Sequence, residues 1–228
     1  TAPAIYYYSH INYSQENYQT ALNGFLKLTK DETFSPIVPY YITHIYFLQK
    51  KFDKVIEYAP GLMENVTEKR MAEVARIIGE SYYMLNRYEE AVPYLEKYMG
   101  NSKYITKEDK YQLAYAYYKS GEYNKAADMF GKLSSGNTLL CHNALYHLAD
   151  CYLKHNDKHQ ARMAFASASK LDFDPKIKED ALFNYALVTY ELSFSPFNEA
   201  IETFNEYIRQ YPDSKRTDEA YKYLVMAY

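Results

Sequence analysis

One unit recurs along this chain and constrains its fold more than any other feature. Its clearest copy runs from Thr106 to Leu133. Apolar residues in this copy are spaced by three and four within two runs, which is the period of amphipathic helices. These residues are Leu113, Ala114, Tyr117, Tyr123, Ala126 and Phe130. The unit is therefore predicted to be two helices joined by a turn.

Local signals predict where the two helices begin and end. Thr106 followed by Asp109 has the form of a capping box at a helix N-terminus. Gly121 can adopt the left-handed conformation that ends one helix and turns into the next. Ala114 and Ala126 are small beside large aromatic residues, so the two helices are expected to approach each other closely at these positions.

The small residue of the second helix recurs as an anchor along the whole chain. The anchors Ala21, Val55, Ala91, Ala126, Ala161 and Ala200 are separated by 34, 36, 35, 35 and 39 residues. Repeats are predicted at 2–35, 36–69, 72–105, 107–140, 142–175 and 178–216, followed by the lone first helix of a further repeat at 217–228. The sixth repeat is lengthened in its turn from Ser193 to Pro196.

This pattern resembles the tetratricopeptide repeat, whose consensus includes G-x-Y-x-x-A-x-x-x-F after the first-helix residues. Two stretches match it best: Gly79 with Tyr82, Tyr88, Ala91 and Leu95, and Gly121 with Tyr123, Ala126 and Phe130. The tryptophan usual in the first helix is missing, because the chain contains no Trp. The resemblance implies an all-α fold: a right-handed superhelical solenoid of antiparallel helix pairs. We expect one continuous solenoid over 1–228 that forms part of a larger protein.

In this family the first helices line a concave face, and partner contacts come from fixed positions along them. The resemblance therefore implies a binding face with three levels, one helical turn apart. The residues at these levels are Tyr6, Tyr40, Arg76, Tyr111, Tyr146 and Phe183, then His10, His44, Glu80, Tyr115 and Asp150, then Tyr13, Phe47, Tyr83, Tyr118 and Tyr190. Tyrosine combines a large apolar ring with a hydroxyl group, which suits contact with another protein. The alternative for any single ring is packing between adjacent repeats.

The expected function is that of a non-enzymatic scaffold that binds a peptide segment or partner helix in an aromatic concave groove. Tyr111, Tyr115 and Tyr118 are the expected anchors, while Arg76 and Glu80 would give polar selectivity. The sequence contains no glycine-rich phosphate loop and no G-x-S-x-G motif, so no enzyme is predicted. Relatives that bind the acidic tail of heat-shock chaperones clamp it with Lys, Asn and Arg residues on successive first helices. The equivalent level of this chain has Tyr40, His44, Arg76 and Glu80, so the clamp pattern is absent.

The alternative function is a structural spacer or self-association arm of a larger envelope protein. The stretch from Thr217 to Tyr228 reads as a first helix without a second helix to cover its apolar residues, which include Tyr221 and Val225. Self-association through this open C-terminal helix is therefore the second partner interaction that the sequence predicts.

Potential metal ligands are densest in the fifth repeat, where Cys141, His142, His147, Asp150, Cys151, His155 and His159 occur. His147 and Cys151 lie four residues apart on one helix face, a spacing that can hold zinc. However, Cys151 occupies a position that other repeats fill with Ile11, Ile45, Ser81, Ala116 and Val188, which indicates a packing site. We therefore predict no metal and no cofactor.

Charge and hydropathy exclude two further classes of partner. The net charge of −3 is scattered along the chain, which argues against a nucleic-acid surface. No apolar run reaches the roughly 18 residues needed to insert in a membrane. The segment from Phe204 to Leu224 resembles repeats of bacterial envelope proteins, such as the lipoprotein of the outer-membrane β-barrel assembly machinery and the periplasmic coordinator of cell division. This favours a periplasmic or envelope location, while two free thiols favour the cytoplasm as the alternative.

Overall fold

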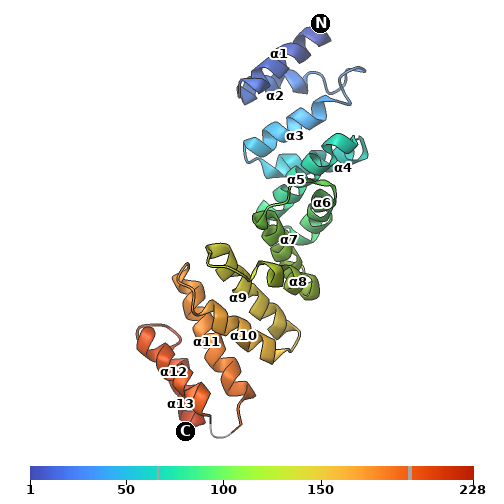
Figure 1. Ribbon diagram of the computed structural model, residues 1–228. Helices are drawn as coiled ribbons and strands as arrows, with labels where there is room; N and C mark the ends of the chain where they lie inside the picture. The colour runs from blue at the N-terminus through green and yellow to red at the C-terminus, as the bar shows by residue number, and fades with distance from the viewer. Residues whose placement is uncertain (66, 195–196) are drawn as a thin grey trace. The chain divides into compact units, whose positions relative to one another are not determined.

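The computed structural model describes residues 1–65, 67–194 and 197–228, so residues 195 and 196 of the lengthened turn lie outside the described part. All regular structure in the described residues is helical (Figure 1). The helices are α1 (Ala2–Ser14), α2 (Tyr18–Leu26), α3 (Val38–Leu48), α4 (Phe52–Asn65), α5 (Glu68–Met84), α6 (Tyr88–Asn101), α7 (Lys107–Lys119), α8 (Tyr123–Leu133), α9 (Leu139–Lys154), α10 (Lys158–Ala168), α11 (Pro175–Leu192), α12 (Asn198–Gln210) and α13 (Thr217–Ala227).

Contacts divide these helices into two compact units, residues 1–105 with α1 to α6 and residues 106–228 with α7 to α13. Within each unit every helix packs against the next one along the chain. In addition, first helices of adjacent repeats contact each other in the pairs α3 with α5, α7 with α9, α9 with α11, and α11 with α13. This sequential packing of helices confirms the predicted all-α fold class. One continuous solenoid from residue 1 to 228 stays a prediction.

Five of the turns within helix pairs share one backbone geometry. Each contains a residue with positive φ, namely Glu16, Lys50, Asn86, Gly121 and Asn156, with φ between 57° and 84°. The N–H of the following residue donates to the carbonyl five positions earlier, as in Asn17 to Asn12 at 2.8 Å and Glu122 to Tyr117 at 2.8 Å. This is the bond of the Schellman motif, which ends helices in a left-handed residue. The turn predicted at Gly121 is confirmed, and it recurs with the period of the anchors.

Helix starts follow the capping residues of the sequence. The predicted capping box is present, because the hydroxyl of Thr106 accepts from the N–H of Asp109 and the carboxylate of Asp109 accepts from the N–H of Thr106. Three first helices, α5, α9 and α11, begin earlier than the predicted repeats, at residues 68, 139 and 175 rather than 72, 142 and 178. Helix α5 follows Thr67, whose side chain forms no capping hydrogen bond. Helix α9 follows the cap Thr138, and α11 follows the cap Asp174 with Pro175 in its first turn. Both arrangements are favourable at helix N-termini and account for the earlier starts of α9 and α11.

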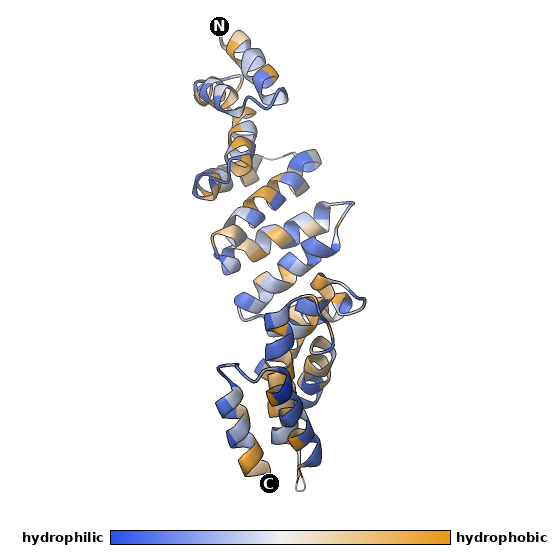
Figure 2. Ribbon diagram, turned by 90° about the vertical axis from the view of Figure 1, so that its left-hand side faces the viewer, coloured by the Kyte–Doolittle hydropathy of each residue, from blue (hydrophilic) through white to orange (hydrophobic). Residues whose placement is uncertain are grey.

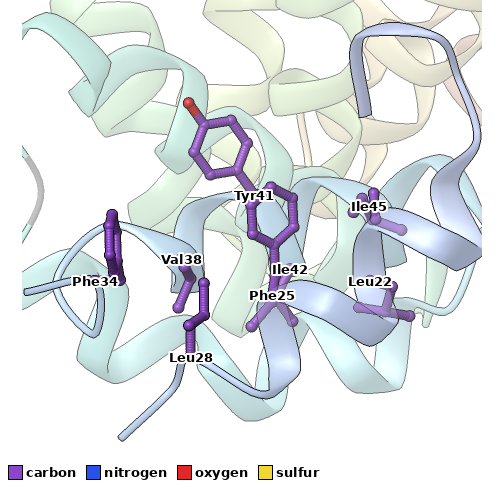
Figure 3. Packing of buried hydrophobic residues seen from close by; sticks show 9 residues of the cluster. Leu22, Phe25, Leu28, Phe34, Val38, Tyr41, Ile42 and Ile45 are labelled. Carbon is purple, nitrogen blue, oxygen red and sulfur yellow. The ribbon is translucent and has the colours of Figure 1, made fainter. Parts of the chain in front are cut away.

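The core of each unit is built around the anchors. All six, Ala21, Val55, Ala91, Ala126, Ala161 and Ala200, are fully buried. The large residues four positions after most of them are buried as well: Phe25, Leu95, Phe130, Phe165 and Phe204. Figure 3 shows one such cluster in unit 1, where the rings of Phe25 and Tyr41 stack at 4.9 Å between centroids. The anchors therefore mark the contacts that hold the helix pairs together.

Gly79 lies at a close approach of α5 and α6. A Cβ atom at this position would come within 2.8 Å of the side chain of Leu95, closer than real Cβ contacts. Because glycine has no Cβ, the two helices can come this close. Gly79, which the family consensus singled out, therefore has a packing role inside a helix rather than a role in a turn.

Hydrophilic and hydrophobic residues alternate along most helices (Figure 2). None of the described helices combines the length and the apolar character that crossing a membrane requires. Ile11, which the repeat alignment places at a buried position, is 55% exposed. The reason is that no described helix covers this side of α1, whereas Cys151 at the equivalent position of α9 is fully buried.

Candidate partner-binding face

In unit 1, the first helices α1 and α3 bring predicted face residues into contact. The hydroxyl of Tyr13 and Nδ1 of His44 form a hydrogen bond of 2.6 Å. The ring of His44 lies parallel to that of Tyr40, with 6.1 Å between centroids. Burial raises the pKa of Tyr13 to about 12 and lowers the pKa of His44 below its usual value. Both side chains are therefore neutral near pH 7, and the bond holds the two rings in place.

The first helix α5 adds two residues that were not predicted from the sequence. The hydroxyl of Tyr40 donates to Oε2 of Glu73 at 2.8 Å, and the guanidinium of Arg70 lies 4.2 Å from the centroid of the Tyr40 ring. Burial, together with the bond to Glu73, raises the pKa of Tyr40. Glu73 and Arg70 precede the predicted residue Arg76 by three and six positions. Glu73 therefore lies on the same helix face as Arg76, and Arg70 lies one turn before Glu73. This spacing is the signal that could have identified Glu73 and, through it, Arg70.

Farther along α5, Arg76 and Glu80 neutralise each other. Nη1 of Arg76 lies 2.8 Å from Oε1 of Glu80, and both side chains are only partly exposed. The guanidinium also lies 5.7 Å from the centroid of the Phe47 ring on α3. Both charges are thus partnered within the chain, so they offer a partner less polar selectivity than the sequence suggested.

In unit 2, Tyr111, Tyr115 and Tyr118 follow one side of α7. Their ring centroids are 6.3 Å apart in the first pair and 6.0 Å apart in the second. The hydroxyl of Tyr118 donates to Oδ2 of Asp150 on α9. Burial, and then this hydrogen bond, raise the pKa of Tyr118. Tyr111, Tyr115 and Tyr118 therefore form a continuous row of rings. Tyr118, at one end of the row, is hydrogen-bonded to the next first helix.

His147 lies at the centre of these rings. Its ring centroid is 5.1 Å from that of Tyr115, 5.2 Å from Tyr118 and 5.5 Å from Phe130. Burial lowers its pKa to about 4, and its Nδ1 atom has no hydrogen-bond partner among the described residues. From its spacing in the sequence, His147 was a candidate zinc ligand only. Its position next to the predicted face residue Tyr146 was the signal for its place in the cluster.

Phe183 was predicted to lie on the binding face, and this prediction was wrong. It is fully buried, where it packs against Tyr207 with 5.1 Å between centroids. The guanidinium of Arg216 lies 3.4 Å from the centroid of its ring. The ring fills the space between α11 and α12, so it belongs to the core and cannot contact a partner in the folded chain.

The other fifteen predicted residues are all partly exposed. On α11, Tyr190 stacks on Phe197 at 5.1 Å, and on α9 the edge of Tyr146 meets Phe165 at 5.9 Å. These rings pack between helices and also reach the surface, so both interpretations left open by the sequence apply to the same residues. Their role in binding stays a prediction. In the described parts of the chain, no group of three or more His, Cys, Asp or Glu residues is placed to hold a metal ion.

Two protein-family models match the sequence. The model described as anaphase-promoting complex, cyclosome, subunit 3 matches residues 84–168, and the model described as tetratricopeptide repeat matches residues 180–214. The second match falls on α11, α12 and the turn that follows. This chain is a tetratricopeptide-repeat protein. Tetratricopeptide repeats mediate contacts between proteins and are typically not catalytic, so protein partners follow for the chain as a class.

Solved tetratricopeptide structures share this fold. YrrB, described as a tetratricopeptide protein with an unusual peptide-binding site, is 17% identical, covers 87% of this chain and 97% of its own, and has a TM-score of 0.63. PilW, a type IV pilus biogenesis factor, is 16% identical over 96% of this chain and 97% of its own, with a TM-score of 0.53.

A tetratricopeptide protein from Cytophaga hutchinsonii gives similar values in its C-terminal part. It is 15% identical, covers 97% of this chain and 95% of its own, and has a TM-score of 0.51. At these identities the likeness concerns the fold alone. No curated protein matches the sequence.

Proposed function

We propose that this tetratricopeptide protein is a non-enzymatic scaffold that binds a peptide segment or partner helix on its first-helix face. The observation that carries the proposal is the row of Tyr111, Tyr115 and Tyr118, whose last hydroxyl donates to Asp150. Rings that are already held in place lose little conformational entropy when a partner binds. Because these rings are partly exposed, each can still give a partner a large contact area.

Asp150 gives this face a chemical preference. In the described residues its carboxylate accepts from Tyr118 and forms no ion pair with a basic side chain, whereas Glu80 is paired with Arg76. A lysine or arginine of the partner would neutralise Asp150 and contact the faces of Tyr115 and Tyr118 through cation–π interactions. The proposed partner segment therefore carries a basic residue beside apolar ones.

The test is a cross-linking pull-down from an extract of the source cell. The unmodified chain is compared with a Tyr111→Ala, Tyr115→Ala variant at a temperature where both are folded. A Tyr104→Ala, Tyr228→Ala variant is the matched control, because both of these tyrosines are 86% exposed and lie outside the face. We expect the face variant to lose a partner that the unmodified chain and the control capture.

With that partner in hand, calorimetry measures the contribution of a single ring. Tyr111→Ala should weaken binding by about 1–3 kcal/mol, as expected for an aromatic anchor. Asp150→Asn should weaken binding and reduce its dependence on salt, because one charge pair is removed. Unchanged affinity in both variants would place the binding site elsewhere on the chain. If neither the unmodified chain nor the face variant captures a partner in the pull-down, the result favours a spacer.

A specific observation favours self-association as a second candidate function. On α13, Tyr221, Val225 and Met226 are 53%, 77% and 57% exposed and line a shared hollow with Lys222. Exposed apolar side chains that lie together are typical of contact surfaces. In this alternative the chain is a structural spacer or self-association arm of a larger envelope protein, and α13 is its contact surface.

For the compartment we propose the bacterial cell envelope or periplasm, with the cytoplasm as the alternative. The support for the envelope is the resemblance of Phe204 to Leu224 to envelope repeats. Cys141 and Cys151 are free and buried, and burial raises the pKa of Cys151 to about 12, so this thiol is unreactive in either compartment. Fractionation of the source cell, followed by detection of the protein in each fraction, distinguishes the two locations.

A further inference from the structure

Unit 1 contains a cleft between the start of α3, the middle of α4 and the first half of α5. Its volume is about 610 Å³, which lies within the usual range of ligand sites of roughly 300–1,000 Å³. The described residues that line it include Pro36, Ile37, Tyr58, Gly61, Leu62 and Arg70. Among the predicted face residues, only Tyr40 also lines this cleft. The cleft is therefore a separate feature from the aromatic row of unit 2.

Part of the cleft wall is the hydrophobic core itself. Leu62 and Val74 line the cleft and belong to a buried cluster with Ile78, and the rings of Tyr40 and Tyr58 pack against this cluster. Ile37 stands on the same cleft and is 37% exposed. An apolar side chain that enters the cleft would thus exchange water for contact with the core, which is favourable in proportion to the apolar area removed from water.

Among its described lining residues, the cleft presents one positive charge without an acidic partner. The guanidinium of Arg70 lies over the rings of Tyr40 at 4.2 Å and Tyr41 at 5.6 Å, and in the described part of unit 1 it forms no ion pair. Glu57, the acidic residue of the lining, is paired with Lys54 at 2.9 Å. The nearby Glu73 accepts from Tyr40.

Stacking on two rings holds the guanidinium of Arg70 in place while its N–H groups stay available. A planar guanidinium in this state binds a carboxylate through two parallel hydrogen bonds. The charge of Arg70 and the apolar wall of the described lining thus favour a ligand that has a carboxylate next to an apolar group.

We propose that this cleft binds a peptide segment in which an apolar side chain adjoins an aspartate or glutamate. The apolar side chain would contact Leu62 and Val74, and the carboxylate would pair with Arg70. That the ligand is a peptide rests on the proposed function, because Tyr40 lies both on the first-helix face and in the cleft wall. A segment bound along α3 can continue past Tyr40 into the cleft.

The first experiment measures fluorescence anisotropy with the full chain and three labelled, C-terminally amidated peptides. The probe is Gly-Leu-Leu-Glu-Leu-Gly, compared with versions that carry Gln or Lys in place of Glu. We expect the Glu peptide to bind about tenfold or more tighter than the Gln peptide, as for a hydrogen-bonded charge pair, and the Lys peptide to bind most weakly. A fourth peptide, Gly-Leu-Leu-Gln-Leu with a free C-terminus, tests whether the terminal carboxylate is the ligand instead.

Arg70→Gln should remove the preference for Glu over Gln. The matched control is Arg87→Gln, because Arg87 also stacks on a tyrosine, Tyr82 at 5.0 Å, but is outside the described lining of the cleft. The control should keep the preference. Equal binding of the Glu and Gln peptides to the unmodified chain would overturn the proposal. Binding of the peptide with the free C-terminus that is tighter than binding of the Glu peptide would overturn it as well.

A second variant blocks the cleft without removing a contact from the core. An added Cβ at Gly61 meets no heavy atom within 4 Å, so Gly61→Phe is expected to fold and to place its ring at the cleft. Gly100→Phe on α6 is the control, since Gly100 has the same free space and is not among the lining residues. We expect Gly61→Phe to abolish binding of the Glu peptide and Gly100→Phe to retain it.

Unchanged binding to Gly61→Phe, or no binding of the Glu peptide at millimolar concentration, would contradict the proposal. The outcome is independent of the aromatic row, because Tyr111 and Tyr115 belong to the other unit. If the cleft variants behave as expected while Tyr111→Ala, Tyr115→Ala leaves partner capture unchanged, the cleft stands and the aromatic row does not. The reverse pattern refutes the cleft alone.

Discussion

At the scale of single residues, hydroxyl groups orient three tyrosines of the first helices. Tyr13 bonds His44, Tyr40 bonds Glu73 and Tyr118 bonds Asp150, with partners 31, 33 and 32 residues farther along the chain. Each bond joins a first helix to the next first helix within the same unit. A phenylalanine at these positions could pack but could not form such a bond, so the hydroxyl group orients the ring. The three partners are a histidine, a glutamate and an aspartate, so each bond is different. The pairs therefore distinguish one repeat contact from another.

His147 should make the stability of unit 2 depend on pH. Its pKa is about 4 in the folded chain, below the value of 6.5 expected when unfolded, because burial disfavours the imidazolium. The unfolded chain therefore binds this proton first as pH falls. Stability associated with His147 is present above pH 6.5 and is lost progressively between pH 6.5 and 4. The loss should amount to roughly 2–3 kcal/mol by proton linkage.

Urea unfolding at pH 7 and at pH 4.5 measures this effect. His147→Gln should show a smaller drop in the free energy of unfolding between the two pH values than the unmodified chain. The matched control is His159→Gln, because His159 is exposed on α10 and its replacement should leave the drop unchanged. An identical drop in all three proteins would show that His147 is not the group responsible.

At the scale of elements, the turn between two helices of a pair is the most regular part of the molecule. The same Schellman geometry is formed by Glu16, Lys50, Asn86, Gly121 and Asn156 at its left-handed position. Asparagine and glycine tolerate this conformation, whereas glutamate and lysine adopt it at a steric cost of about 1–2 kcal/mol. The hydrogen bonds of the turn and the packing of the two helices hold these residues there. The conformation of the turn is thus determined by the adjoining helices as much as by the residue at its left-handed position.

Replacing the strained turn residue by glycine should stabilise the chain. We expect Glu16→Gly to raise the free energy of unfolding by about 0.5–1 kcal/mol, since relief of strain exceeds the added entropy of the unfolded chain. Gly121→Ala is the reciprocal variant and should lower it by about 1 kcal/mol. Denaturant unfolding of both variants at pH 7 checks the signs. A loss of stability in Glu16→Gly would mean that its side chain stabilises the turn.

At the scale of the whole molecule, each unit has its own core, while α13 leaves apolar side chains uncovered. Tyr207 and Phe204 close the core of unit 2 against α11 and α13, but Val225 and Met226 point away from it and are exposed. A helix of a tetratricopeptide array normally has a helix on each side. The uncovered side of α13 therefore matters for how the isolated chain behaves in solution.

The isolated chain should self-associate through α13. We expect its mass in light scattering to rise with concentration, and Val225→Lys with Met226→Lys to keep it monomeric, because two charges cannot be buried in an apolar contact. Met163→Lys is the matched control, since Met163 is 63% exposed on α10, away from α13. The control should associate like the unmodified chain. A constant monomer mass for all three proteins would rule out self-association.

Much of the fold could be predicted from the sequence, because the decisive signals are local. The six anchors recur at a period near 35 residues, and all are buried. The capping box at Thr106 and the left-handed turn at Gly121 depend on residues within one turn of each other, and both were predicted correctly. Helix period, small residues at close approaches and capping residues act through neighbours in the sequence, so they can be read without a structure.

The details of the candidate sites depend on contacts between repeats and emerge only when neighbouring helices are placed side by side. The position of a residue along its first helix does not reveal that Phe183 is covered by Tyr207 or that five rings surround His147. Nor does it show that Arg70 stacks beside a cleft lined by Leu62 and Val74. The physical reason is that burial, pKa and cavity shape are set by side chains on adjacent helices. The repeat pattern specifies how those helices follow one another, but not which side chains fill the space between them.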